Sequence, residues 1–412
     1  MKNQPQNVLF IQNFGPVKQA ELELKSINML IGEQSIGKST IAKLIAIFTD
    51  NASLSIIAST GFKAWKSCLA MYDLDVYADE SYRVKYKCTT KDFTLSVDIA
   101  KGRVSSYILK NGEKITDRER IREMIIRMRD IVKTEDFLKV ILKEAKQLSE
   151  MKEKDPRYLA LSLQSMIESS LYVPAERVIY SLFNNLRSAL SLMRETVSST
   201  YMRFMVNLDR ASARQKKYES QLLKITYLNE DDGQFFLDHA SKKKYSLIHA
   251  SSGIQSTIPL LLVLDDIKNR EYSSVVIEEP ETNLFPNTQV DLLKLILRKA
   301  KDDGRIVTVT THSPYLLSAL NNYLFAGSMA GELDKEGLEK LDKIIPSWLR
   351  LHTEDCSVYS IGETINESGA YCTTLIDEET KMIETNTLDK VSFLMGDEFD
   401  AIQDIYMSNH VD

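Results

Sequence analysis

The sequence lacks the features that mark membrane-spanning, exported or zinc-binding proteins. It contains no run of about eighteen apolar residues, so we expect no transmembrane helix and no membrane partner. Residues 1–7 are polar and offer no apolar signal core, which predicts a cytoplasmic location. The four cysteines form no CxxC pair, which predicts reduced thiols and no structural zinc; they are Cys68, Cys88, Cys356 and Cys372.

The chain also lacks an excess of positive charge. Its net charge is −6, so bulk charge does not make it a binder of polyanions, and a nucleic-acid contact needs a local basic patch such as 242–244. With 43% hydrophobic and 27% charged residues in a chain of 412, the composition is that of a globular protein with two or three domains.

A phosphate-binding loop is present near the N-terminus. Residues 32–39 read GEQSIGKS, which matches GxxxxGK[ST], and they lie between an apolar run at 27–31 and a helical pattern at 40–48. We expect Lys38 to reach the β- and γ-phosphates of ATP and Ser39 to ligate Mg²⁺. The expected ATP-binding residues of this segment are Gly32, Glu33, Gln34, Ser35, Ile36, Gly37, Lys38, Ser39 and Thr40.

Two later strands end in polar residues of the kind that complete an ATPase site. The apolar run 275–277 ends at Glu278 and Glu279; we expect Glu278 to hold Mg²⁺ and Glu279 to act as general base on water. The run 308–311 ends at His312, which we expect to contact the γ-phosphate. Taken alone, a Glu-Glu-Pro segment is also typical of a solvated turn, and a lone histidine of a structural role.

A fourth segment, 249–255, opens an apolar helix with a Ser-Gly step. The N-terminus of a helix binds anions, and within one chain this second anion site is surplus beside the phosphate loop. We therefore expect Ser252, Gly253 and Gln255 to meet the ATP of a second copy. The alternative is a serine that only caps its own helix.

The order of these patterns predicts an α/β fold of the P-loop NTPase class, as an ABC-type ATPase head with an antiparallel β layer and a helical insertion. The β layer is predicted from strand patterns at 82–88, 93–99 and 104–109, and the insertion from helical patterns at 117–149 and 181–223. We predict four segments: an N-terminal ATPase lobe (1–113), the insertion (114–228), a C-terminal ATPase lobe (229–320) and an extension without an assigned fold (321–412).

This motif order resembles the ABC ATPases of the RecF/SMC group. The likeness is closer to their OLD-like branch, and three segments carry it: IQNFGP at 11–16, IEEPE at 277–281 and THSP at 311–314. Similar ATPase subunits occur in bacterial anti-phage systems such as PARIS and Septu. The resemblance implies ATP and Mg²⁺ as ligands, hydrolysis to ADP and phosphate, and a site shared between two copies.

The chain departs from the family pattern at several positions. Glu278 stands where many relatives have Asp, and Ser251 and Ile254 replace the Leu and the second Gly of the LSGGQ signature. The Q-loop glutamine has no match, and the loop 174–177 stands in its place, with Arg177 expected near phosphate. OLD proteins carry a Toprim nuclease domain, but the acidic clusters 377–379 and 397–400 follow no strand pattern, so we predict no nuclease here.

These expectations define a function and two alternatives. The leading hypothesis is an ATPase switch of a prokaryotic anti-phage system, which forms a homodimer or a higher homo-oligomer and acts through a separate effector protein. The alternatives are a RecF-like repair ATPase that clamps DNA, and an assembly scaffold that binds ATP with little turnover.

Overall fold

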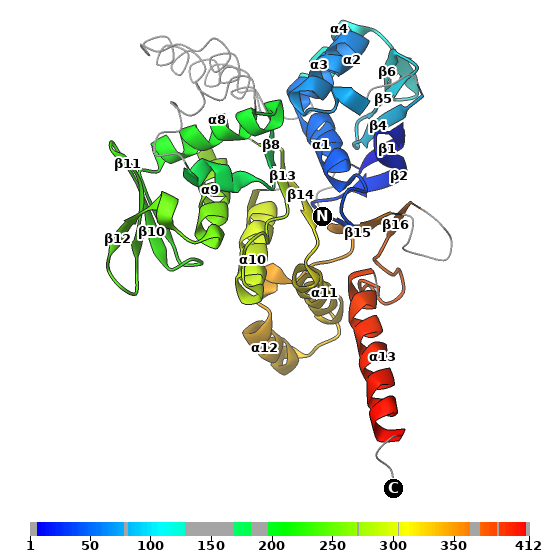
Figure 1. The fold of residues 1–412 in the computed structure, drawn as a ribbon. Coiled ribbons are helices and arrows are strands. Elements are labelled where there is room, and N and C mark those ends of the chain that lie inside the picture. Colours follow the sequence, from blue (N-terminus) through cyan, green and yellow to red (C-terminus); the bar gives the residue numbers. More distant parts are fainter. Residues whose placement is uncertain are drawn as a thin grey trace.

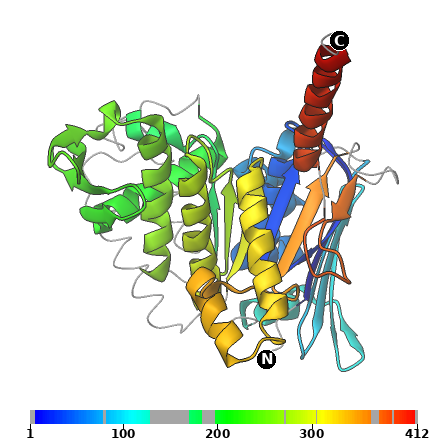
Figure 2. The ribbon, with the colours of Figure 1, turned by 90° about the horizontal axis from the view of Figure 1, so that it is seen from below.

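A computed structural model describes residues 6–77, 81–127, 169–182, 197–269, 272–303, 305–362, 371–384 and 387–408. Figures 1 and 2 present two lobes of sheet and helix joined at a central sheet, with one helix projecting from the body.

The central sheet has six strands in the order β16-β15-β3-β14-β13-β8. All neighbouring pairs are parallel except β15 and β16. The strands are β3 (Ile27–Gly32), β8 (Ser170–Val173), β13 (Ser274–Glu278), β14 (Ile306–Thr311), β15 (Cys356–Ile361) and β16 (Cys372–Thr374). Every residue of the first five is buried, which explains why 27–31 and 275–277 read as short apolar runs without alternation.

Alternate residues of the central strands enter two separate cores, one on each face of the sheet. Val275 and Ile277 belong to the core that contains α8, α9, α10 and α11, whereas Val276 packs into the core of the N-terminal lobe. The central sheet is therefore covered by helices on one face and by the N-terminal lobe on the other.

The N-terminal lobe contains the predicted antiparallel sheet, in the order β2-β1-β4-β5-β6-β7. Its strands are β1 (Gln6–Phe14), β2 (Val17–Leu24), β4 (Arg83–Thr89), β5 (Thr94–Ala100), β6 (Arg103–Lys110) and β7 (Glu113–Ile115). Burial alternates along β1 and β4, because one face packs on the core and the other meets solvent. The strand patterns at 82–88, 93–99 and 104–109 each match a strand to within a residue.

Helices contribute to the cores on both faces of the central sheet. The α-helices are α1 (Lys38–Thr49), α2 (Asn51–Thr60), α3 (Phe62–Met71), α4 (Arg118–Arg127), α8 (Ser199–Arg214), α9 (Ser252–Asp266), α10 (Pro286–Asp303), α11 (Pro314–Met329), α12 (Lys335–Ile344) and α13 (Thr387–Ser408). The 3-10 turns are η1 (Asp75–Tyr77), η2 (Arg177–Leu182), η3 (Leu247–His249), η4 (Ile267–Asn269) and η5 (Ser347–Leu349).

Within these described helices, no single one is long and apolar enough to cross a bilayer. The pair α1 and α2 reaches the required length and composition only together, with a bend of 79° between them, and most of their residues lie in the core.

The segment predicted as a helical insertion is only partly helical where the structure describes it. Residues 128–168 and 183–196, which include most of the first predicted helical stretch and part of the second, lie outside the described residues. The second stretch was expected to continue to 223, but α8 ends at Arg214 and a strand follows. A four-stranded sheet in the order β12-β11-β10-β9 occupies 217–246, formed by β9 (Lys217–Ser220), β10 (Ile225–Glu230), β11 (Gly233–Asp238) and β12 (Lys244–Ser246).

The last segment, which was left without a fold, contributes strands to the central sheet. Strand β15 adds to the central sheet directly beside β3, and the predicted boundary at 320 falls inside α11. Beyond 384 the chain leaves the body as α13, the projecting helix of Figures 1 and 2.

Candidate functional site

The phosphate loop connects β3 to α1 along a backbone that requires glycine at two positions. Gly32 has φ +144° and Gly37 has φ +98°. A Cβ atom at Gly32 would lie 2.2 Å from the carbonyl oxygen of Ile361, and one at Gly37 would lie 2.8 Å from Val17. Because the N–H groups of this loop and of the first turn of α1 have no intrahelical acceptors, the loop offers them to an anion.

Lys38 begins α1 and folds back over the loop. Its side chain is buried, and Nζ donates to the carbonyl oxygens of Gly32 (2.8 Å) and Glu33 (2.5 Å). Burial lowers the pKa of Lys38 to about 8, although nearby carboxylates, Glu279 first among them, oppose this shift. The two residues that follow differ in burial: Ser39 is exposed and Thr40 is buried. The ammonium group therefore lies where phosphate oxygens would replace the two carbonyls.

The C-terminal part of the chain supports this loop in a way that no sequence pattern signals. The hydroxyl of Tyr371 lies within hydrogen-bonding distance of the carbonyl oxygens of Pro16 (2.8 Å) and Ile36. Tyr371 therefore joins the turn between β1 and β2 to the phosphate loop.

Glu278 ends β13 and is buried. Burial raises the pKa of its carboxyl, while a hydrogen bond from the Ser39 hydroxyl acts in the opposite direction. Among the described residues, Oε1 of Glu278 has no hydrogen-bond partner. A buried carboxylate oxygen without a donor, beside a serine hydroxyl, matches the hard oxygen ligands that Mg²⁺ takes together with phosphates and water. Ser39 and Glu278 therefore fit the expected Mg²⁺ site.

Glu279 has a different environment from its neighbour. Its backbone is left-handed, with φ +41°, and its side chain is 39% exposed. Oε1 lies 3.4 Å from Nε2 of His312. The hydrogen bond from His312 lowers the pKa of Glu279 against the effect of burial, and the charges of Lys38 and Arg177 add to the lowering. An ionised, partly exposed carboxylate beside a histidine has the properties of a general base.

Sequence reasoning gave no role to Glu281, the last acidic residue of the Glu-Glu-Pro-Glu segment. Its Oε1 accepts hydrogen bonds from the Thr311 hydroxyl (2.6 Å) and from the backbone N–H of His312 (2.8 Å). Burial raises the pKa of this carboxyl. Glu281 thus ties the segment after β13 to the end of β14, and fixes the backbone that presents His312.

The Ser-Gly step lies at the start of α9 as expected. Ser251 is the N-cap residue but makes no side-chain capping bond, and Ser252 is exposed at the first helical position. A Cβ at Gly253 would lie 2.8 Å from the carbonyl oxygen of Asn283, so the glycine allows α9 to approach the segment after Glu281.

Gln255 differs from its expected role as an ATP ligand. Its side chain is buried, and Nε2 donates to the carbonyl oxygens of Leu247 (3.2 Å) and Ile248 (2.9 Å). In this structure it holds the turn η3 that precedes α9.

Arg177, which was expected near phosphate, lies close enough to the site for its charge to lower the pKa of Glu279, but its hydrogen bonds go to the backbone. The side chain is fully buried, and its guanidinium group donates to backbone carbonyl oxygens around the ends of β8 and β13. Its donors are therefore engaged inside the protein. The position of Arg177 in the loop 174–177 gives no sign in the sequence that its side chain is buried.

The structure brings together Lys38 and Ser39 of the phosphate loop, Glu278 and Glu279 at the end of β13, and His312 after β14. The mutual charge effects of Lys38 with Glu278 and Glu279, and the contact of Glu279 with His312, join the three strand ends in one site. The exposed Ser252 makes none of the hydrogen bonds found among the described residues of this cluster.

Comparison with known proteins gives a family and a set of structures. The family described as AAA ATPase domain matches residues 7–158 and 139–317. Among solved structures, an SMC head bound to the C-winged helix domain of ScpA is 12% identical and aligns with 90% of this chain and 97% of its own, at a TM-score of 0.43. The SMC head domain from Thermotoga maritima is also 12% identical, with coverages of 77% and 92% and a TM-score of 0.38.

A third structure is the SMC head with an extended coiled coil bound to the C-terminal domain of ScpA, derived from Pyrococcus furiosus. It is 12% identical, with coverages of 96% and 99% and a TM-score of 0.39. Comparison with curated proteins gives no match.

Proposed function

Because this chain belongs to the AAA ATPase domain family, we propose that it binds Mg-ATP, hydrolyses it to ADP and phosphate, and uses its nucleotide state to control a partner protein. One observation carries the proposal: two neighbouring carboxylates lie in different environments, Glu278 buried with an Oε1 that has no hydrogen-bond partner among the described residues and Glu279 partly exposed beside His312, and their pKa values are shifted in opposite directions. Adjacent acids with opposite shifts are suited to two separate tasks, metal binding and proton abstraction.

The residues of the site divide the work of phosphoryl transfer. The phosphate loop and Lys38 hold the β- and γ-phosphates, and Ser39 with Glu278 holds Mg²⁺. Mg²⁺, when bound, neutralises the charge on the phosphate oxygens. Glu279 is ionised at neutral pH, because its pKa is lowered, and so accepts a proton from the attacking water. His312 orients Glu279 and donates to a γ-phosphate oxygen.

Phosphate release from Mg-ATP by the purified chain tests the proposal. Glu279→Gln should lower kcat by about 10²–10⁴-fold with ATP binding retained, because an amide cannot accept the proton. Lys38→Ala should lose both binding and hydrolysis. Glu336→Gln is the matched control, since this glutamate is exposed on α12 in an ion pair with Lys340. If Glu279→Gln turns over ATP at the rate of the Glu336→Gln control, Glu279 is not the base.

The exposed start of α9 supports a site completed by a second copy. Ser252 and Gly253 lie at the positive end of a helix of 15 residues, where an anion is stabilised. Each chain already has a phosphate loop, so this second anion site suits the γ-phosphate bound by a partner copy. Blocking hydrolysis with Glu279→Gln should then trap a dimer in Mg-ATP, which light scattering measures as a doubled mass.

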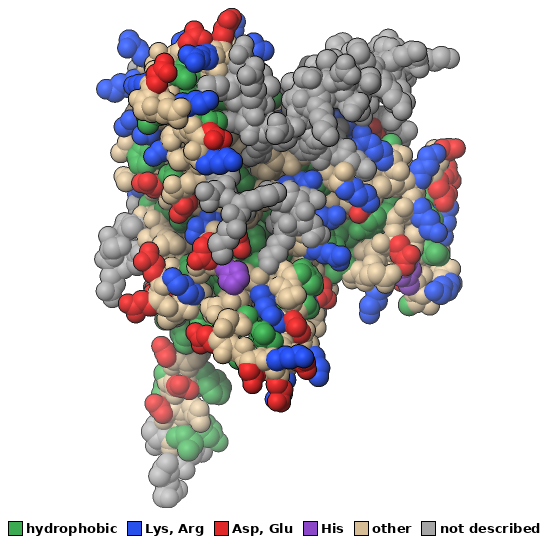
Figure 3. Space-filling view, turned by 180° about the vertical axis from the view of Figure 1, so that it is seen from behind, with side chains coloured by type: hydrophobic (Ala, Val, Ile, Leu, Met, Phe, Trp, Pro, Cys, Tyr) green, Lys and Arg blue, Asp and Glu red, His purple; other side chains and the backbone are tan. Residues whose placement is uncertain are grey.

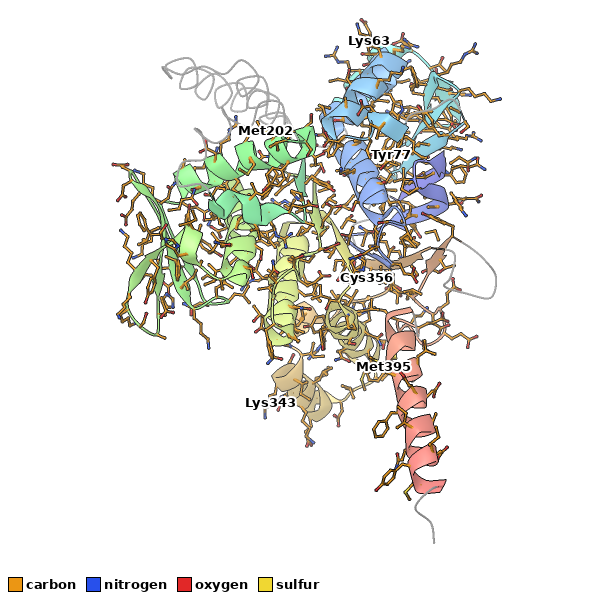
Figure 4. All side chains as sticks on the ribbon, in the orientation of Figure 1. Lys63, Tyr77, Met202, Lys343, Cys356 and Met395 are labelled. Carbon is orange, nitrogen blue, oxygen red and sulfur yellow. The ribbon has the colours of Figure 1, made fainter. Side chains whose placement is uncertain are left out.

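The projecting helix α13 supports a separate partner protein. Met395, Phe399, Ile402 and Tyr406 recur at helical spacing along one side and are 60–67% exposed; Figure 4 labels Met395 on this helix, and Figure 3 gives its exposed surface. An exposed apolar stripe of this length marks an interaction surface.

The charges of α13 define the chemistry of that partner. The helix carries five acidic residues (Asp389, Asp397, Glu398, Asp400 and Asp404) against the single base Lys390. Glu398 lies on the apolar side, one turn from Met395 and from Ile402. A second α13 would add acids to acids, and an anionic membrane surface would be repelled. We therefore assign α13 to a basic amphipathic segment of a different protein.

The resemblance to anti-phage ATPases gives the biological role within the proposal, with the partner as the effector. The test is phage plating on cells that carry the natural gene cluster. Protection should be lost when Glu279→Gln replaces the wild-type residue and kept with Glu336→Gln. Equal protection with both variants would separate the ATPase from defence.

A further inference from the structure

Arg177 is a buried arginine that makes its hydrogen bonds with backbone carbonyl groups. Its side chain has no exposed surface. Nη1 donates to Pro174 O (3.0 Å) and Glu278 O (2.8 Å), Nη2 to Glu279 O (2.8 Å), and Nε to Ser256 O (3.0 Å). One planar group therefore joins the end of β8, the end of β13 and the first turns of α9.

This guanidinium group remains charged at neutral pH. Burial lowers the pKa of Arg177 to about 10, and the carboxylates of Glu281, Glu279 and Glu278 act to raise it. A buried charge is costly unless its donors are satisfied. Four of the five N–H groups are matched with carbonyl oxygens in a fixed fork, which a lysine with a single nitrogen cannot reproduce.

The bond to Glu279 acts at a backbone position that is strained. Glu279 has φ +41°, a left-handed conformation that costs free energy for a residue other than glycine. Its N–H donates to Thr310 O (2.9 Å), and its carbonyl oxygen accepts from Arg177 and from the hydroxyl of Thr282 (2.8 Å). These contacts hold the peptide in the conformation that directs the carboxylate of Glu279 toward His312.

The bond to Ser256 reaches the helix that begins with the Ser-Gly step. Ser256 lies one turn after Ser252 on α9, and its hydroxyl donates to Thr282 O (3.1 Å). A displacement of the start of α9 is therefore transmitted to the peptide of Glu279 by two routes, of which Arg177 is the direct one.

We propose that Arg177 is a positioning residue that couples the two ATP sites of the dimer, by linking the catalytic Glu279 of one site to the α9 helix that the same chain presents to the other. The inference rests on the proposed head-to-tail dimer. When the γ-phosphate bound by the partner meets Ser252 and Gly253, the shift of α9 passes through Arg177 and sets the carboxylate of Glu279. Each site then hydrolyses ATP efficiently only when the other is filled.

Arg177→Lys tests this coupling, because it keeps the charge and removes the fork. We expect kcat to fall by about 10²-fold, since small misplacement of a reacting group has that effect. ATP binding should change less than threefold, and the Hill coefficient for ATP, which approaches two in a coupled two-site dimer, should fall to one. Hydrolysis is measured against ATP concentration and normalised to the number of nucleotide-binding sites, so that unfolded chains do not contribute.

Arg305→Lys is the matched control. Arg305 is also a buried arginine, and its Nε donates to Tyr272 O (2.8 Å) at the opposite ends of the same central strands. This variant should lose stability as Arg177→Lys does, measured as Tm, while the Hill coefficient stays at the wild-type value.

The outcomes separate the coupling from the proposed function. If Glu279→Gln dimerises in Mg-ATP but Arg177→Lys keeps the wild-type Hill coefficient, or loses kcat only as far as the Arg305→Lys control, the coupling is refuted and the ATPase dimer stands. If Glu279→Gln remains a monomer in Mg-ATP, the dimer itself is refuted, and the coupling with it.

Discussion

The pKa of Lys38 predicts that nucleotide affinity falls as pH rises through 8. In the free protein, burial lowers this pKa to about 8, and Nζ donates to two carbonyl oxygens of the loop. Phosphate oxygens favour the ammonium form, so bound nucleotide raises the pKa. Binding therefore takes up a proton above pH 8, and the affinity has its full value below about pH 7.

The expected magnitude follows from this titration. While the pKa of the bound state stays above 9, the dissociation constant rises by about tenfold between pH 7 and pH 9, which corresponds to about 1.4 kcal/mol. Above pH 8 the change approaches a factor of ten for each pH unit. An unburied lysine, with its ordinary pKa near 10.4, would give no change over this range.

Fluorescence titration with a labelled ATP analogue that resists hydrolysis measures the effect in saturating Mg²⁺, and Glu279 is kept because its charge raises the pKa of Lys38. Lys38→Arg should give a flat profile from pH 7 to pH 9, because a guanidinium group keeps its proton. Lys43→Arg, one turn and a half further along α1, is the control and should keep the wild-type slope. A wild-type profile without a slope, or an equal slope in Lys38→Arg, refutes the assignment.

Three further predictions concern the remaining parts of the site. His312→Ala should lower kcat by about 10-fold or more with a smaller change in KM, since its contact matters most as charge develops; an effect on KM alone would make it a ground-state contact. In a mixed dimer of a Ser252→Arg chain and a Lys38→Ala chain, one shared site carries both changes and the other carries neither. The mixture should therefore recover activity or trapped nucleotide at the intact site, and recovery of neither refutes a shared site. A synthetic basic amphipathic helix should bind the wild type in fluorescence anisotropy but not Ile402→Glu, and Phe325→Glu on α11 is the control. If the wild type forms a dimer without nucleotide and Ile402→Glu dissociates it, α13 instead binds a second copy of the chain.

The parts of the fold that sequence could predict are those in which burial leaves a local pattern. The apolar runs at 27–31 and 275–277 lie in β3 and β13, because strands buried on both faces favour continuous apolar residues, and the run 308–311 lies in β14. The alternating strands of the N-terminal lobe were equally readable, since one of their faces meets solvent.

Other elements depend on contacts between distant residues and could not be predicted. Strand β15 belongs to the sheet through pairing with β3, across more than 300 residues, and nothing in 356–361 specifies that neighbour. The hairpin of β10 and β11 had a usable signal, the turn Asp231-Asp232-Gly233 between runs that contain Tyr227 and Phe236, but the predicted boundary at 228 between the insertion and the C-terminal lobe fell inside β10.

The site divides in the same way. Lys38, Glu278, Glu279 and His312 could be proposed from the sequence, because each belongs to a short motif that follows or ends a strand. Glu281, Tyr371 and the buried role of Arg177 were missed, because their functions lie in bonds to the backbone of other segments, which no spacing in the sequence records.

The electrostatics of the assembled site indicate how nucleotide and metal enter. Four carboxylates, from Glu33, Glu278, Glu279 and Glu281, act on the charge of Lys38, and the nearby Arg177 is held by carbonyl groups. A triphosphate adds further negative charge, which one ammonium group cannot balance in a partly buried site. The unpartnered Oε1 of Glu278, beside the Ser39 hydroxyl, lies where an accompanying cation would restore that balance. Mg²⁺ is therefore expected to enter with the phosphates. Its ligand Glu278 is buried, whereas Glu279, which must contact water, is partly exposed.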